Sequence, residues 1–392
     1  MMINNNTIMN RRYHGLDILR SFALILGLFF HASIPFTEIP IPLWIIYYDS
    51  KSWVYDTILM GTHSFRMPLF FLLAGFFSAL LYRKLSTKNY LIGRTKKIVL
   101  PFIASMIFLT PLMVIEYISA GFVTNPWETD NQFHWKNYPV FHFWFLEILI
   151  IITALVISFI VSIKYFFPIT HDYLQRLLEA DSNENQLFWN ILYLICIGLI
   201  GFLSWTEFPG DQFIYAFAIS QPMDKIFFYL IFFLIGWLLY INVSLFERVR
   251  RSVKKNLLLG SAALFILLWV RYWLFVNKDE QFIMLGILGN IAVPIAAVFL
   301  SLGLFGFFTH EKFKPSGTIN YLVSASYWIY LIHVPIILYV QFLISDWQIN
   351  AFIKYVFIIA ITFMISCFTY STYIIAKKLL FKRKLTTDKS LK

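Results

Sequence analysis

Charged residues are scarce in this chain. Only 14% of its 392 residues are charged, whereas 59% are hydrophobic and the mean hydropathy is +0.70. Soluble globular proteins average about 25% charged residues, so the composition excludes an ordinary soluble domain and predicts a polytopic membrane protein. The net charge of +11 does not indicate nucleic-acid binding, because the basic residues fall in short connections between apolar runs.

Cysteine is almost absent as well. Cys196 and Cys367 both lie in apolar stretches, which excludes a disulfide framework and a CxxC site. The histidines show no HxxxH or HExxH spacing, and the chain has no glycine-rich phosphate loop or GxSxG sequence. We therefore expect no metal site and no serine nucleophile of that kind. No A-x-A cleavage site follows the first apolar segment, so we expect that segment to be retained as a span.

Long apolar runs, in contrast, are abundant. A helical span needs about 20 mostly apolar residues, and ten segments qualify, of which the fifth is the shortest. They are 17–36, 55–82, 98–119, 141–163, 187–203, 223–243, 256–275, 282–308, 320–344 and 351–376. We expect an all-α fold of about ten transmembrane helices, with 1–380 as a single transmembrane domain and 381–392 as a basic cytoplasmic tail.

The basic residues of the connections alternate between the two sides of these spans. One set of alternate connections holds 24 lysines and arginines, and the other holds only Lys51, Lys136, Lys225 and Lys278. Cytoplasmic connections carry the excess of basic residues, so both termini are predicted to be cytoplasmic. Three connections then predicted to lie outside, 38–53, 125–139 and 204–213, are rich in aromatic residues and acids. They fit an aromatic interfacial belt, a platform for sugar rings, or both.

Two ionisable residues, Arg20 and His31, lie inside the first apolar segment. Ten residues separate them, so on a helix they point the same way, roughly 16 Å apart along the axis. Ala23 and Gly27 lie on the same side between them. Ionisable groups at bilayer depth are costly and usually functional. The predicted orientation places Arg20 near the cytoplasmic end and His31 beyond the midplane, toward the outside.

Other spans also carry ionisable residues. His63 and Arg66 share a face of the second span. Arg66 needs an anionic or polar partner, which is either a structural ion pair, for example with Asp56 or Glu147, or a contact with an acyl or acceptor group. Glu147 is the only carboxylate of its span, and it neutralises a buried cation or orients a catalytic histidine. Arg271 is a further intramembrane cation with no motif around it.

Two more groups of polar residues fit either a structural or a functional interpretation. Arg94 and Lys97, beside the start of the third span, fit either phosphate binding or ordinary basic-loop topology. Ser326, Tyr330 and His333 form a polar stripe on one face of the ninth span. Such a stripe usually faces the interior of a bundle, where it either makes hydrogen bonds between helices or contributes to a site.

Five motifs in this order resemble the membrane acyltransferase-3 family, most closely its glucan succinyltransferase-like branch. They are Arg20 and His31 preceded by Leu16-Asp17; Phe65-Arg66-Met67-Pro68; Arg94, Lys97 and Pro101; His142-Phe143-Trp144-Phe145-Leu146; and the segment from Ser326 to Pro335. The motifs extend over most of the chain, roughly 14–335. The chain departs from the family pattern at Lys97, where arginine is common, and at Ala74, where serine often precedes the glycine.

The resemblance implies acyl transfer, acetyl or succinyl, from cytoplasmic acyl-CoA to a hydroxyl of an envelope glycan across the bacterial inner membrane. It implies no permanently bound cofactor and no nucleic-acid partner. His31 would act as general base or acyl carrier. The implied roles are catalytic for His31, Glu147 and His333; donor-binding for Arg20, Arg94, Lys97 and Asp17; and substrate-binding for His63, Arg66, His142, Trp144, Tyr327 and Tyr330.

Two other classes of function compete with this interpretation. A transporter or flippase for an envelope glycan also needs many spans and intramembrane charges, although we find no inverted repeats with paired broken helices. A membrane receptor or scaffold would leave Arg20 and His31 without a role. Movement of the acceptor across the membrane without consumption of acyl-CoA would indicate the transporter.

Overall fold

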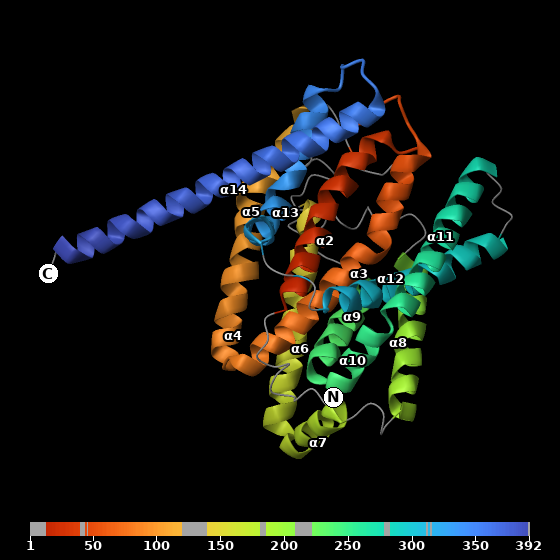
Figure 1. Ribbon diagram of the computed structural model, residues 1–392, viewed down its shortest axis with the longest axis vertical. Coiled ribbons are helices and arrows are strands. Elements are labelled where there is room, and N and C mark those ends of the chain that lie inside the picture. Colours follow the sequence, from red (N-terminus) through yellow and green to blue (C-terminus); the bar gives the residue numbers. More distant parts are fainter. Residues whose placement is uncertain are drawn as a thin grey trace, which may run out of the picture.

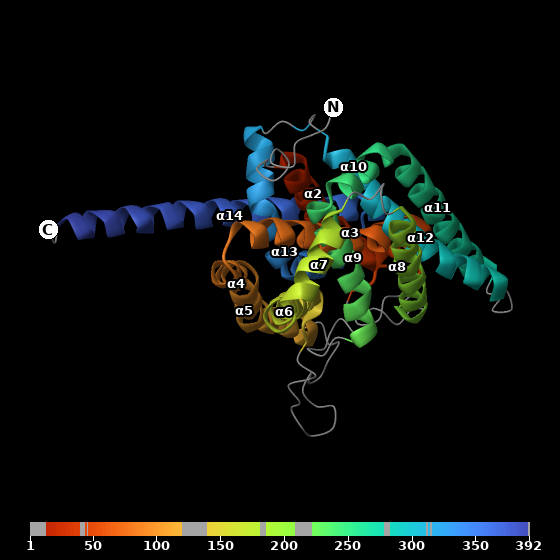
Figure 2. The same cartoon turned by 90° about the horizontal axis from the view of Figure 1, so that it is seen from below.

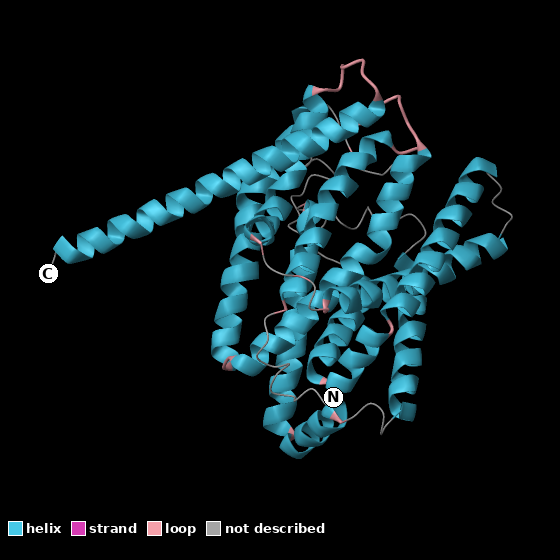
Figure 3. Cartoon of the chain, in the orientation of Figure 1, coloured by secondary structure: helices cyan, strands magenta, loops and turns pink. Residues whose placement is uncertain are grey.

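The computed structural model describes residues 13–39, 44, 46–119, 139–180, 186–207, 222–277, 283–310, 313 and 316–390. All of the regular secondary structure in these ranges is helical (Figures 1 and 3). The predicted all-α class is therefore confirmed. Arg11, Arg12, Lys136, Lys278, Lys312 and Lys314, which enter the predicted orientation, lie outside the described residues, as do residues 40–43, 45 and most of 125–139 and 204–213.

The described chain forms long helices joined by short helices and loops. In order they are α2 (His14–Ser33), η1 (Ile34–Phe36), α3 (Trp53–Lys84), α4 (Thr87–Arg94), η2 (Thr95–Val99), α5 (Leu100–Ser119), η4 (Phe141–Phe143), α6 (Trp144–Phe166), α7 (Pro168–Glu179), α8 (Gln186–Glu207), α9 (Met223–Ile241), α10 (Val243–Arg251), α11 (Val253–Asn277), α12 (Ile283–Phe308), α13 (Gly317–Leu343) and α14 (Ala351–Ser390). Within the described residues, nine helices are long and apolar enough to cross a membrane. The remaining predicted span, the fifth, corresponds to α8.

Helix α3 lies at the centre of the bundle, where it packs against α2, α9 and α12 (Figure 2). Two glycines allow the contact between α3 and α9. A Cβ atom on Gly75 would lie 1.9 Å from the carbonyl oxygen of Phe233, and one on Gly236 would lie 1.8 Å from that of Leu72. Neither position has room for a side chain, so the two backbones approach as closely as small-residue helix packing permits.

The two ends of the bundle differ in structure. At one end, α4 and α7 are short helices that connect neighbouring spans (Figure 1). An ion pair between Arg83 and Glu179 joins the end of α3 to α7 there. We call this the arginine end, because it also holds Arg20 and Arg94. At the opposite end lie η1, the segment 46–52 and the connection 344–350; we call it the histidine end.

Helix α14 closes the described chain and extends well beyond the bundle (Figure 1). It packs against α13 and α2. The helix continues without a break past the predicted domain boundary at residue 380, so that boundary stays a prediction.

Candidate active site

Helix α2 carries both Arg20 and His31 on one unbroken helix, as the spacing predicts. Between them, Ala23 is fully buried and Gly27 is buried too. A Cβ atom on Gly27 would lie 2.8 Å from Nη1 of Arg66 and 3.6 Å from Nε2 of His333. The missing side chain thus allows an arginine from α3 and a histidine from α13 to approach α2.

Three histidines from three separate elements converge at the histidine end. The ring centroid of His31 in α2 lies 5.2 Å from that of His333 in α13 and 6.3 Å from that of His142 in η4. His142 and His333 are 5.1 Å apart and are buried. The sequence motifs predicted each histidine as a site residue, and the folding of α2, η4 and α13 brings the three rings together.

Backbone carbonyls fix the orientation of two of these rings. His333 Nδ1 lies 2.7 Å from the carbonyl of Tyr330, and His142 Nε2 lies 3.2 Å from that of Leu331. Because a carbonyl only accepts, each of these nitrogens must donate. In the neutral rings, Nε2 of His333 and Nδ1 of His142 therefore carry free lone pairs. Within the described residues neither atom has a hydrogen-bond partner, and Nδ1 of His31 has none either.

The backbone next to His142 is strained. Phe141 has a φ of 46°, which is unusual for a residue other than glycine. The position is held from outside, because the hydroxyl of Tyr330 donates to the carbonyl of His142 at 2.9 Å. Strain of this kind persists where the surroundings impose it and often accompanies functional sites. Here it presents the His142 ring to the other two histidines.

Arg66 lies beside the histidines and is 7% exposed. Its guanidinium carbon is 4.6 Å from the centre of the Phe30 ring. Within the described residues it forms no ion pair, and its Nε has no hydrogen-bond partner. The structural ion pair with Asp56 considered above is therefore wrong. Both carboxylate oxygens of Asp56 instead accept from backbone amides, at 2.8 Å from Glu38 and 3.2 Å from Ile39.

The ring of His31 is also held by residues that the sequence motifs missed. Trp44 stacks on it at 5.8 Å with an interplanar angle of 14°. The indole N–H of Trp44 donates to Oε1 of Gln341 at 3.1 Å, and Nε2 of Gln341 lies 3.4 Å from the carbonyl of His31. Gln341 is fully buried. A lone glutamine in an apolar span was the signal that could have identified it.

The remaining predicted substrate residues lie at different distances from this cluster. The His63 ring stacks on Phe30 at 5.6 Å, which places it next to Arg66 and His31. Tyr330 contacts both His142 and His333. Tyr327 stacks on Tyr330 at 6.3 Å, and its buried hydroxyl has no partner in the described part of the chain.

Glu147 and Trp144 form a neighbouring group rather than part of the histidine cluster. The ammonium of Lys225 lies 3.9 Å from the centre of the Trp144 ring, and both Glu147 and Lys225 are buried. Among the described residues, no hydrogen bond or ion pair connects Glu147 to His31, His142 or His333. The predicted role of Glu147 in orienting a catalytic histidine stays a prediction.

The arginine end gathers most of the predicted donor-binding residues. Arg20 pairs with Asp17 at 3.6 Å and keeps 42% of its side chain exposed. Arg94 donates to the hydroxyl of Ser78 at 2.6 Å and is close enough to Arg20 to repel it electrostatically. Two cations that share one region and still have exposed surface favour an anionic ligand such as a phosphate.

Lys97 follows Arg94 by three residues. It is exposed in η2, a π-helical turn that follows α4 directly. Turns of this kind often lie at functional sites. The structure therefore places Lys97 at the rim of the arginine end, where it contributes charge rather than a fixed contact.

One member of the predicted polar stripe has a structural role. The hydroxyl of Ser326 donates to that of Ser21 at 3.2 Å, and the hydroxyl of Ser21 donates to the carbonyl of Asp17 at 2.8 Å. These bonds connect α13 to α2 inside the bundle. For Ser326 the interpretation as a hydrogen bond between helices is confirmed, whereas Tyr330 and His333 on the same face belong to the histidine cluster.

The fold and these two clusters define a multi-pass helical membrane protein with a buried polar site and a separate cationic site, to both of which α2 contributes. The Acyl_transf_3 family model, described as an acyltransferase domain, matches residues 13–371. The chain therefore belongs to this acyltransferase family, and it is a membrane O-acyltransferase.

Curated relatives resemble the chain over most of its length. A "Glucans biosynthesis protein C" of Salmonella paratyphi B is 25% identical over 351 residues, which cover 84% of this chain and 83% of the relative. The protein of the same name from Salmonella gallinarum is 26% identical over 345 residues, with the same two shares. No solved structure matches the chain.

Proposed function

We propose that this protein transfers an acetyl or succinyl group from cytoplasmic acyl-CoA to a hydroxyl group of an envelope glycan, with His31 as the central catalytic residue. One observation carries the proposal. His31, His142, His333 and Arg66 converge in a buried cluster with unpartnered nitrogen atoms, at the opposite end of α2 from a pair of arginines. Such a cluster fits proton transfer and stabilisation of negative charge.

The donor would bind at the arginine end. Arg20 and Arg94 are the cations available there for the phosphates of acyl-CoA, and Asp17 orients Arg20. Lys97 adds a positive charge, but as a lysine it cannot make the bidentate contact to a phosphate that an arginine can. The described basic connections Arg83–Lys97 and Arg248–Lys255 support a cytoplasmic location for this end.

The acyl arm would then run along the face of α2 that carries Ala23 and Gly27. Both are small, and about 16 Å of helix separates Arg20 from His31. Gly27 lies next to Arg66 and His333, so a thioester that passes it reaches the histidine cluster. The phosphates stay at one end of α2 while the reacting carbonyl lies at the other.

The chemistry follows from the groups that meet there. His31 takes the proton of the acceptor hydroxyl as its oxygen attacks the thioester carbonyl. A new C–O bond forms, and the carbonyl oxygen becomes an oxyanion that the fixed charge of Arg66 stabilises. The C–S bond then breaks, and the departing thiolate of CoA takes the proton back from His31. An acyl group carried on His31 itself would divide the transfer into two such steps.

His142 and His333 would support His31 in this reaction. Each has one ring nitrogen committed to a backbone carbonyl, and the other is buried without a partner in the described residues. Both can therefore accept a hydrogen bond from the acceptor hydroxyl or from His31. His63 and Tyr330 complete the walls of the site.

The relatives named for glucan biosynthesis support a glucan as the acceptor, which the proposal places in the envelope. The histidine end would then face away from the cytoplasm, and both termini would be cytoplasmic. The acyl group is acetyl or succinyl. Arg66 serves the oxyanion in either case, and with a succinyl group it is also a cation available to the terminal carboxylate.

The test uses purified protein in lipid vesicles, with radiolabelled acetyl-CoA or succinyl-CoA and a glucan acceptor. We expect one of the two donors to label the glucan, His31→Ala and His31→Gln to abolish labelling, and Arg20→Ala to raise the KM for acyl-CoA. His171→Ala is the matched control, because His171 pairs with Asp172 on the short helix α7 at the arginine end. Full transfer by His31→Ala would overturn the catalytic assignment, and glucan transport without consumption of acyl-CoA would favour the flippase.

A further inference from the structure

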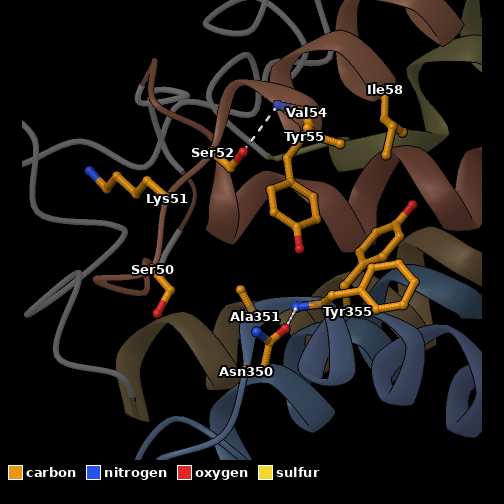
Figure 4. Close-up of a pocket in the computed structure, with 10 residues that line it drawn as sticks. Ser50, Lys51, Ser52, Val54, Tyr55, Ile58, Asn350, Ala351 and Tyr355 are labelled. Atoms are coloured by element: carbon orange, nitrogen blue, oxygen red, sulfur yellow. Dashed lines mark hydrogen bonds between the residues drawn. The ribbon is translucent and has the colours of Figure 1, made fainter.

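A cavity of about 290 Å³ lies at the histidine end, between the start of α3 and the start of α14 (Figure 4). Its walls come from the segment 50–58 and from the segment 350–355. Both α3 and α14 begin as candidate membrane spans within these segments. The cavity is therefore at the level where spans emerge from the bilayer, and its volume is near the lower limit of small-molecule sites.

A buried tyrosine points an unused hydroxyl into this cavity. Tyr55 is 5% exposed. Its ring is held between Phe36 at 4.8 Å and Tyr355 at 5.3 Å. Figure 4 shows its hydroxyl directed into the open space above Asn350 and Ala351. The hydroxyl forms no hydrogen bond within the described residues. Because the hydroxyl opens onto the cavity, a ligand bound there can accept a hydrogen bond from it.

Apart from Lys51, the other polar side chains that line the cavity are neutral. Oδ1 of Asn350 accepts from the amide of Phe352 at 2.8 Å, which leaves its NH2 group available as a donor. The hydroxyl of Ser50 also borders the space (Figure 4). Lys51 directs its ammonium away from the cavity, over the Tyr47 ring at 5.7 Å. Neutral donors beside aromatic rings match a sugar ring, with its hydroxyls and apolar face, better than a phosphate.

The cavity is also connected to the histidine cluster through its walls. The hydroxyl of Tyr355 donates to the carbonyl of Phe29 at 3.4 Å, and Phe29 precedes His31 by two residues on α2. Tyr55 also packs against Phe36, the last residue of η1, and η1 directly follows α2. The walls of the cavity therefore contact the helix that carries His31 and the turn that follows it.

We infer that this cavity is a subsite for a neutral sugar unit of the acceptor glycan, remote from the unit that is acylated. The inference rests on the proposed function for the identity of the polymer. It predicts that long acceptors bind more tightly than short ones, because only a long acceptor occupies the subsite and the histidine cluster together. Tyr55 and Asn350 would donate hydrogen bonds to the remote sugar.

The test measures binding and transfer separately. Binding of a linear neutral gluco-oligosaccharide is measured without acyl donor, on full-length protein in lipid nanodiscs, beside a disaccharide of the same linkage. We expect Tyr55→Phe and Asn350→Ala each to weaken oligosaccharide binding about three- to tenfold, the effect of one lost hydrogen bond. Disaccharide binding should not change. Tyr339→Phe is the matched control, because Tyr339 is 55% exposed and lies outside the cavity.

The transfer assay separates this inference from the proposed function. In that assay Tyr55→Phe should raise the KM for the long acceptor while kcat and the KM for acyl-CoA stay unchanged. If acyl transfer occurs and neither variant affects the long acceptor, the subsite is refuted and the function stands. If the oligosaccharide binds through Tyr55 but no donor labels it, the function is refuted and the subsite stands. Binding of anionic phospholipid at Tyr55 in place of the oligosaccharide would also refute the sugar subsite.

Discussion

Replacement of Gly27 by alanine tests whether the position of Arg66 matters for acyl transfer. The added methyl group would lie 2.8 Å from Nη1 of Arg66, well inside van der Waals contact. Its nearest neighbour is the far end of a flexible side chain, so the guanidinium can move away by several tenths of an ångström. A misplacement of about 1 Å at a reacting centre can cost about a hundredfold in rate, so we expect kcat to fall about 10- to 100-fold.

The same substitution should have little effect on folding. Alanine favours the helix by about 1 kcal/mol relative to glycine, which offsets the cost of displacing the arginine. Gly61→Ala in α3 is the matched control, because a Cβ atom there would meet nothing within 4 Å. We expect Gly61→Ala to keep full activity and to have an equal or higher Tm.

The assay is acyl transfer to glucan in vesicles, together with thermal unfolding of each variant in detergent. A double-mutant cycle with Arg66→Ala identifies the cause. If Gly27→Ala acts by moving Arg66, it should have almost no further effect in the Arg66→Ala background. Wild-type kcat in Gly27→Ala would refute the argument that Arg66 must be held in place. A large loss of Tm would show instead that the packing around α2 had failed.

Two further predictions concern the frame around the site. Gln341→Leu leaves the buried indole N–H of Trp44 without an acceptor, so we expect the unfolding free energy to fall by about 1–3 kcal/mol. We also expect a lower kcat with an unchanged KM for acyl-CoA. An unchanged kcat would show that Trp44 does not orient His31. Gly75→Ala places a methyl group 1.9 Å from the backbone oxygen of Phe233. Because a backbone atom cannot move aside as a side chain can, we expect the yield of folded protein to fall sharply. A wild-type Tm would contradict the packing of α3 against α9.

The sequence predicts the fold class and one helix of the site well. Apolar runs of span length mark the membrane helices, and a spacing close to whole helical turns places Arg20 and His31 on one face of α2. Both inferences are local, because they depend on periodicity within a single helix. His142 and His333 were recognised by motif, but their meeting with His31 depends on how α2, η4 and α13 pack, which no single segment encodes.

The predictions for partners of buried charge were less successful. Asp56 precedes Arg66 by ten residues on the same helix, which is about 15 Å along the axis, and the amides of Glu38 and Ile39 already satisfy its carboxylate. The sequence places Glu147 at about the same depth in the membrane as the histidines, and in the structure it lies on α6 near Trp144. Which acid meets which base is decided by helix rotation and loop path, and composition carries no information on either.

Trp44 and Gln341 are residues of the site that the sequence motifs did not identify. Trp44 belongs to a connection whose aromatic residues were assigned to an interfacial belt or a sugar platform. In the structure it covers the ring of His31 instead, and its indole is held by Gln341 from α13. An aromatic residue in a loop and a glutamine in a span acquire a role only through their contact, 297 positions apart in the chain.

The arrangement of α2 also bears on how a single bundle could carry an acyl group across a membrane. Ser21 near its first turns is bonded to Ser326 of α13, and His31 near its last turn is held by Gln341 of the same helix. The two sites are thus fixed to one pair of packed helices. In the proposed function the distance between donor phosphates and reacting carbonyl is then set by helix length, so the flexible acyl arm moves and the bundle does not need to alternate between two openings as a transporter does.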